Sequence, residues 1–269
     1  MEQGLLYCPS CRSEASGVYC PVCGEKVKLE KAELSLSHFL KDAFEEVFNF
    51  DSKFIRTIRL LIFKPGFLTN EIIAGKRVNY IKPFRIYIIV VVLHFLAFSF
   101  FKSGDIFAVD RFPLFKLVPG IHELVHQYEV KSGLSHSVFI ETVDQKIKDN
   151  LNVIFYFIVF VMALYFKLIY FRSGKYYIEH LYYMLHLISF GLIRNIVLIP
   201  LVILDLIPIA FVLAAITQLT YTWISLKNVY HEGIGATTIK VFLTVFGFIF
   251  VFFPAICLSL AIGIIQLLY

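Results

Sequence analysis

The chain has 269 residues, of which 58% are hydrophobic and 17% are charged, and it contains 29 Phe and 15 Tyr. Soluble domains contain roughly 45–50% apolar residues, so this composition, with a mean hydropathy of +0.75, excludes an ordinary water-soluble domain and predicts a membrane protein. The net charge of +5 is less informative than the positions of the basic residues, because these set orientation in a membrane.

The first predicted element is a zinc ribbon over residues 1–28, where the polar sequence does not fit a cleavable signal peptide. Its two C-x-x-C turns, "CPSC" and "CPVCG", contain Cys8, Cys11, Cys20 and Cys23. Each turn supplies two thiolates to one side of a tetrahedral metal, so the pair predicts a closed, structural zinc site with four cysteine ligands. Two disulfides or a redox pair are the alternative. Thiolate ligands require a reducing compartment, which places the N-terminus in the cytosol.

The ribbon is expected to contact a protein partner or to brace the helices that follow it. Nucleic acid is not an expected partner, because the segment "RSEASGVY" between the turns offers one arginine and no basic, aromatic surface.

Residues 29–83 are predicted to form amphipathic helices. In "ELSLSHFLKDAFEEVFNF" and "DSKFIRTIRLLIFKPG" apolar residues recur at helical spacing, and the second stretch stops at Pro65-Gly66. Neither is long and apolar enough to span a bilayer, so both are expected to lie along the membrane or against a helix bundle. Packing within a soluble subdomain is the alternative.

Residues 84–269 are predicted to form an all-α polytopic bundle of about five transmembrane helices, each near the roughly 20 residues that a hydrocarbon core requires. The third and fourth are expected to form a tight hairpin at Asp205, and Arg194 is expected to meet that carboxylate. The five segments cover about 84–101, 151–170, 178–202, 206–228 and 238–268.

The basic residues predict the orientation. They precede the first segment, lie between the second and third, and flank the connection from the fourth to the fifth, so an odd number of spans places all three groups on one side. That side is expected to be the cytosolic face of the inner, cytoplasmic membrane, with the loop 102–150 outside. The bilayer is the expected partner, and the basic cluster before the first span predicts contact with anionic lipids, at about 1 kcal/mol per charge. Topological retention alone also explains these residues.

Four segments resemble a bacterial membrane family known as domain of unknown function 3667. They are "FNFDSKFIRTIRLLIFKPG", "IIAGKRVNYIKPFRIY", "YYIEHLYYMLHLISF" and "LKNVYH", and they follow the cysteine turn in "YCPVCGEKV". The resemblance implies an N-terminal zinc ribbon and a multispan bundle, and it implies no activity.

One motif in the predicted outer loop has the pattern of a zinc peptidase. His122, Glu123 and His126 form H-E-x-x-H, in which two histidines four apart on a helix hold Zn²⁺ and the Glu polarises a bound water. Pro119-Gly120 would place these histidines in a first helical turn, and no third ligand stands at the extended spacing. The context favours coincidence over catalysis.

A second candidate site lies within the predicted membrane segments. His94, His186 and Gln218 are expected at about the same depth, while Glu179 shares a helix face with His186 and His180 points about 120° away. Such a group could bind a ligand or metal, or carry protons. Hydrogen bonding between helices is the alternative.

Two functions follow from these sites. The lack of a complete catalytic set favours a non-enzymatic membrane protein in which the ribbon and amphipathic helices couple to the bundle as a regulatory, scaffolding or small-molecule-handling component. The alternative is a membrane metalloenzyme that uses either the H-E-x-x-H motif or the intramembrane histidines. A transporter has less support, because no inverted repeat is evident.

Overall fold

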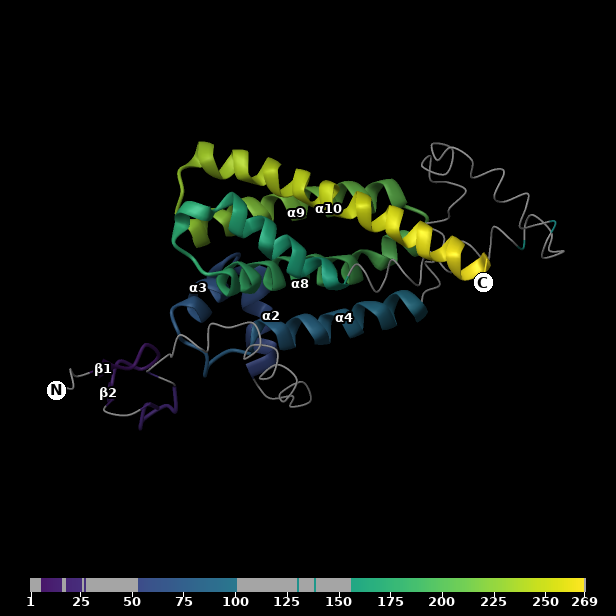
Figure 1. Cartoon of the computed structure of the whole chain (residues 1–269). Helices are drawn as coiled ribbons and strands as arrows, with labels where there is room; N and C mark the ends of the chain where they lie inside the picture. Colours follow the sequence, from purple (N-terminus) through teal and green to yellow (C-terminus); the bar gives the residue numbers. More distant parts are fainter. Residues whose placement is uncertain are drawn as a thin grey trace.

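The computed structural model describes residues 6–15, 18–25, 27, 53–100, 130, 138 and 156–268. These residues are mostly helical, with a small two-stranded sheet near the N-terminus. Helices α8, α9 and α10 run alongside one another, α4 lies beside α8, and the sheet lies near the end of the bundle that carries α3 (Figure 1).

The sheet belongs to the predicted ribbon. Strand β1 (Leu6–Tyr7) pairs antiparallel with β2 (Glu14–Ala15), and Leu6 lies opposite Ala15. The first C-x-x-C turn connects the two strands, so the pairing closes a short hairpin around Cys8 and Cys11.

The predicted helix after the ribbon is present as α2 (Lys53–Phe63), and a short helix, α3 (Phe67–Ile73), follows it. The helix ends before Pro65, since the residue preceding a proline is disfavoured in helical conformation. Gly66 then turns the chain with φ of +81° and caps the start of α3. α3 packs against α8 and α9, and α2 packs against α8 and accepts a hydrogen bond from Tyr221 of α9, so both helices lie against the bundle. The preceding helix, predicted between residues 33 and 50, lies outside the described residues.

The remaining helices form the bundle. They are α4 (Pro83–Phe100), the helix Tyr156–Ile169, the short 3-10 helix η4 (Phe171–Ser173), α8 (Tyr177–Ile203), α9 (Ile207–Tyr230) and α10 (Ile234–Leu268). Within the described chain, three segments have the length and apolar composition to cross a membrane: Tyr177–Ile203, Ile207–Tyr230 and Ile234–Pro254. The helices at 83–100 and 156–169 are also apolar, but their described parts are shorter than these three segments. The chain is therefore a multi-pass membrane protein, and the count of five spans remains a prediction.

α8 forms the centre of the bundle. Its residues 180–189 are all buried, and they pack against α3, α4 and α9. By contrast, α9 and α10 expose large apolar side chains, as lipid-facing helices do. The most exposed of these are Phe211, Ile234, Ile239, Phe242 and Phe250.

The predicted hairpin joins α8 to α9. Asp205 adopts a left-handed conformation with φ of 58°, and the amide of Leu206 donates to the carbonyl of Leu201. Pro208 lies in the first turn of α9, where a missing amide proton costs no helical hydrogen bond.

A glycine lets the helix 156–169 approach α10 closely. A Cβ on Gly247 would lie 2.2 Å from Cε1 of Tyr165, so only glycine fits at this crossing. The Tyr165 hydroxyl donates to the carbonyl of Leu243 at 2.8 Å. The helix 156–169 is thereby part of the same bundle as the three long apolar helices.

Candidate functional site

The two cysteine turns have the same backbone structure. In the first turn the amide of Cys8 donates to the carbonyl of Ser13 at 2.9 Å, and the amide of Arg12 donates to the carbonyl of Cys8 at 2.9 Å. Arg12 has a positive φ of 63°, which closes the turn and directs both thiols to one side.

The second turn repeats the first turn twelve residues later in the sequence. The amide of Cys20 donates to the carbonyl of Glu25 at 2.7 Å, and the amide of Gly24 donates to the carbonyl of Cys20 at 3.0 Å. Gly24 has φ of 73°, as Arg12 does in the first turn. The ribbon is thus a tandem repeat, "LYCPSCRSEA" followed by "VYCPVCGEKV", in which each copy forms one cysteine turn.

The four cysteine sulfurs form one cluster that fits a tetrahedral metal. All four Sγ atoms lie within 4.8 Å of one another, and the Cys8–Cys23 and Cys11–Cys20 Sγ pairs are each 3.5 Å apart. Ligands at about 2.3 Å from Zn²⁺ would be roughly 3.8 Å apart, whereas a disulfide requires about 2.05 Å. The four cysteines are free thiols, so the geometry favours the metal over the disulfide alternative.

Ser13 supports the thiolate form that binds metal. Its hydroxyl lies 3.0 Å from both the Cys11 and the Cys20 Sγ atoms. The hydrogen bond from Ser13 lowers the pKa of Cys20 to about 6 and also lowers the pKa of Cys11. Deprotonated thiols are the metal ligands, so Ser13 belongs to the site, and sequence reasoning missed it.

Glu25 attaches the ribbon to the loop that leads into α4. Its side chain is only 2% exposed, and its Oε2 atom accepts the amides of Arg77 at 2.8 Å and Val78 at 3.0 Å. The Ser10 hydroxyl donates to the same oxygen at 2.7 Å. Three donors on one buried carboxylate oxygen form a charge-assisted set.

The loop that receives Glu25 is itself held in place. A Cβ on Gly75 would meet Cγ of Pro9 at 3.6 Å, so the first cysteine turn packs directly on this glycine. Glu71 bonds the Lys76 ammonium at 2.7 Å and accepts the Tyr80 hydroxyl at 3.3 Å. Burial, followed by the Glu71 charge, raises the pKa of Tyr80.

The loop falls within a known family segment. Residues 51–95 match the family model described as protein of unknown function, DUF3667. The predicted resemblance to this family is confirmed over these residues. No curated protein and no solved structure matches the chain. The DUF3667 segment, residues 51–95, covers α2, α3, the loop bound by Glu25 and most of α4.

His186 contacts the DUF3667 segment. This residue of α8 is 4% exposed, and its Nδ1 atom lies 2.9 Å from the Thr69 hydroxyl of α3. Its Nε2 atom and the hydroxyl of Ser189, one turn further along α8, have no hydrogen-bond partner among the described residues. The structure therefore makes His186 a link between α8 and α3.

Gln218 has a different partner from the one predicted for a shared intramembrane site. The Arg194 guanidinium donates to the Gln218 side-chain oxygen at 2.7 Å and to the carbonyl of Ala214 at 2.8 Å. Arg194 also donates to the Asn195 side chain, while Asp205 is exposed in the turn. Arg194 thus crosslinks α8 to α9, in place of the predicted contact with Asp205.

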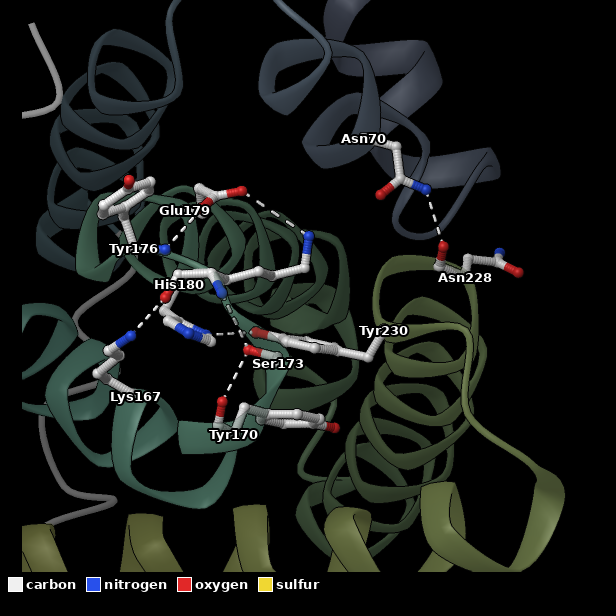
Figure 2. Close-up of polar contacts among 10 residues, drawn as sticks. Asn70, Lys167, Tyr170, Ser173, Tyr176, Glu179, His180, Asn228 and Tyr230 are labelled. Atoms are coloured by element: carbon white, nitrogen blue, oxygen red, sulfur yellow. Dashed lines mark hydrogen bonds and ion pairs between the residues drawn. The ribbon is translucent and has the colours of Figure 1, made fainter. Parts of the chain in front are cut away.

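His180 and Glu179 lie at the end of the bundle near the DUF3667 segment (Figure 2). The Nδ1 atom of His180 lies 2.8 Å from the Tyr230 hydroxyl, and the Tyr230 ring stacks on Tyr170 at 3.6 Å between centroids. Glu179 accepts the amide of Tyr176 at 2.6 Å and so caps α8 at its start. These contacts join the ends of three helices at one level.

The remaining predicted residues are not brought into a common site. His94 is half-buried on α4, and His122, Glu123 and His126 lie outside the described residues. Among the residues that the structure describes, the four cysteines are the one group of three or more His, Cys, Asp or Glu whose ligand atoms are close enough for a shared ion.

Proposed function

We propose that the chain is a scaffolding or regulatory protein of the cytoplasmic membrane. Its zinc ribbon lies in the cytosol and binds a protein partner, and the DUF3667 segment connects the ribbon to a bundle of five membrane-spanning helices. The zinc is structural, because four thiolates complete a tetrahedral site and leave no coordination position for a substrate.

One observation carries this proposal: the buried Glu25 carboxylate bonded to the amides of Arg77 and Val78. A ribbon on a free tether would need no such contact. Hydrogen bonds to a charged group contribute about 1.5–3 kcal/mol, so Glu25 holds the metal-bound turn in one orientation on the loop before α4. A partner bound to the ribbon is thereby connected to the membrane bundle.

The partner is expected on the exposed apolar face of the ribbon. Tyr19 and Val22 are 62% and 72% exposed, and both belong to the second cysteine turn. Apolar and aromatic side chains exposed on a small domain are typical of protein contacts. Neither side chain is a metal ligand, so the face can be altered while the four thiols remain.

The test is crosslinking and affinity capture of the full chain in membranes. The double variant Tyr19→Ser/Val22→Ser is expected to lose the captured partners while retaining zinc. Phe171→Ser is the matched control, because Phe171 is 66% exposed at the start of η4 and lies outside the ribbon. Glu25→Ala is expected to retain zinc but to make the ribbon more susceptible to protease.

Capture of the same partners by the double variant would contradict the proposal. So would a ribbon that stays equally protected from protease in Glu25→Ala, since the ribbon would then be held by other contacts. Zinc content measured on each variant separates loss of the surface from loss of the fold.

A further inference from the structure

Helix α2 has an outward face that its packing on the bundle does not explain. Thr57 and Leu61 are buried, at 0% and 1% exposed, on the side that meets the bundle. On the other side Ile55 and Phe63 are 76% and 74% exposed. Two large apolar side chains exposed on one short helix indicate a surface that is covered in the working protein.

The exposed face is also basic. Ile55, Arg59 and Phe63 follow one another at intervals of four residues and are all exposed, so they form a single stripe along the helix. Arg59 lies between the two apolar side chains. The helix contains Lys53 and Arg56 as well, and no acidic residue. The stripe therefore suits a surface that is both apolar and anionic.

The position of α2 along the bundle indicates the nature of that surface. The Tyr221 hydroxyl donates to the carbonyl of Leu61 at 2.7 Å. Tyr221 lies nine residues before the end of α9 at Tyr230, which is about 13 Å along the helix axis. The 24 residues of α9 span about 36 Å, against a hydrocarbon thickness of roughly 30 Å. With α9 centred in the membrane, about 3 Å of the helix extends beyond the hydrocarbon at each end, so the C-terminal part of α2 lies about 10 Å inside the headgroup boundary. This is the deep end of the range that the apolar face of an interfacial amphipathic helix reaches, about 5–10 Å.

We propose that the Ile55–Arg59–Phe63 stripe binds the anionic phospholipids of the leaflet on the ribbon side of the membrane. Ile55 and Phe63 contact acyl chains below the headgroups, and the Arg59 guanidinium extends toward the surface and binds lipid phosphate in a bidentate manner. The long arginine side chain reaches the phosphates while its methylene groups remain among the apolar atoms. In Figure 1 α2 runs across the direction of α8, α9 and α10, as a helix lying in the membrane plane does.

This proposal goes beyond partner capture by the ribbon and does not depend on it. The chain has one tryptophan, so replacing Trp223 with Phe leaves a background without tryptophan fluorescence. Into that background Ile55→Trp or Phe63→Trp is introduced, and the full chain is reconstituted in bilayers containing brominated phospholipids. Val22→Trp is the matched control, because Val22 is 72% exposed on the ribbon.

Brominated acyl chains are expected to quench tryptophan at 55 and 63 at least twofold more than tryptophan at 22, while aqueous acrylamide quenches in the opposite order. Equal quenching at all three positions would overturn the proposal and would leave a protein surface or the cytosol as the environment of the stripe.

The anionic preference has its own measurement. Bilayers of zwitterionic lipid receive the same small fraction of either brominated phosphatidylglycerol or brominated phosphatidylcholine. Phosphatidylglycerol is expected to quench tryptophan 63 more strongly, and Arg59→Gln is expected to abolish the difference. Quenching that is equal for the two lipids in the unsubstituted helix would show burial in lipid without anion recognition and would overturn that part of the proposal. Both results leave partner capture through Tyr19 and Val22 unaffected.

Discussion

Ser13 and Glu25 occupy equivalent positions in the two cysteine turns, but their side chains have different partners. The Ser13 hydroxyl faces the thiols of Cys11 and Cys20, whereas the Glu25 carboxylate faces the loop at Arg77 and Val78. One copy of the repeat therefore stabilises the metal ligands, and the other attaches the ribbon to the membrane segment.

The metal content of the chain provides a test at the residue scale. Purified chain is expected to contain one zinc per molecule, and replacing Cys11 and Cys20 with serine is expected to abolish it, because two remaining thiols cannot complete the tetrahedron. Elemental analysis by mass spectrometry provides the measurement. A metal equivalent that persists after these substitutions would instead support the metalloenzyme alternative, with ligands such as His94 and His186 or the H-E-x-x-H motif.

Sequence reasoning grouped the four clustered cysteines but missed the residues that support them. The C-x-x-C spacing is a local pattern, so Cys8, Cys11, Cys20 and Cys23 are readable from the sequence. Glu25 finds its partners 52 and 53 residues away, and no periodicity connects them. The twelve-residue repeat could have pointed to Ser13 and Glu25. Aligning the two copies shows that these equivalent positions hold different residues, whereas the cysteines are shared.

At the scale of the elements, the predicted segments agree closely with the helices. The segment predicted at 178–202 is Tyr177–Ile203, and the one at 206–228 is Ile207–Tyr230. The bounds agree because a membrane-spanning helix needs about 20 apolar residues and is flanked by polar or charged residues. The predicted α2 is also present, but the separate helix α3 was not predicted.

Predicting how deep each residue lies in the membrane was less informative about side-chain partners. It placed His186 and Gln218 at one level, yet depth does not specify a helix face, and the two side chains contact Thr69 and Arg194 instead. The hairpin between α8 and α9 would have predicted these partners. His180 pairs with Tyr230, and Arg194 with Gln218, so each pair lies nearly symmetrically about the turn at Asp205.

The turn between α2 and α3 gives a test at this scale. Gly66 has φ of +81°, and a Cβ there would lie 2.9 Å from the carbonyl oxygen of Ser225 on α9. Gly66→Ala is therefore expected to lower the free energy of unfolding by roughly 2–4 kcal/mol, through backbone strain and displacement of α3. Thermal unfolding in detergent provides the measurement.

Gly174→Ala is the matched control for this substitution. Gly174 has φ of +70° but no atom within 4 Å of the added Cβ, so strain of about 1–2 kcal/mol alone is expected. Equal losses in the two variants would show that the contact of Gly66 with α9 contributes nothing to stability.

At the scale of the whole molecule, most of the basic side chains that the structure describes lie at one end of the bundle, with Arg194 as the exception. Lys240 lies 3.7 Å above the Tyr170 ring, Lys227 lies over Trp223, and the Asn70 amide donates to the carbonyl of Asn228 (Figure 2). Residues from the DUF3667 segment, the loop before α8 and the connection from α9 to α10 thus meet at the same end. By the positive-inside rule, this shared position predicts that this end of the bundle faces the cytosol.

Orientation is testable with two exposed positions at opposite ends of α8. In a Cys257→Ser background, Leu204→Cys is expected to react with a membrane-impermeant thiol reagent in intact cells. Phe171→Cys is expected to react only after the cells are permeabilised. Both side chains are exposed, at 67% and 66%, so accessibility within the fold is matched. The reverse pattern would place the ribbon outside the cell and would remove the reducing environment that its thiolates need.

The tandem repeat of the ribbon implies that metal capture is cooperative. Each copy holds two sulfurs, and the Cys8–Cys23 and Cys11–Cys20 pairs both join one copy to the other. A single copy supplies only two of the four ligands, so we expect it to be unstable without the other copy. Separating the copies with a long flexible insert should therefore weaken zinc affinity by orders of magnitude, although every ligand would still be present.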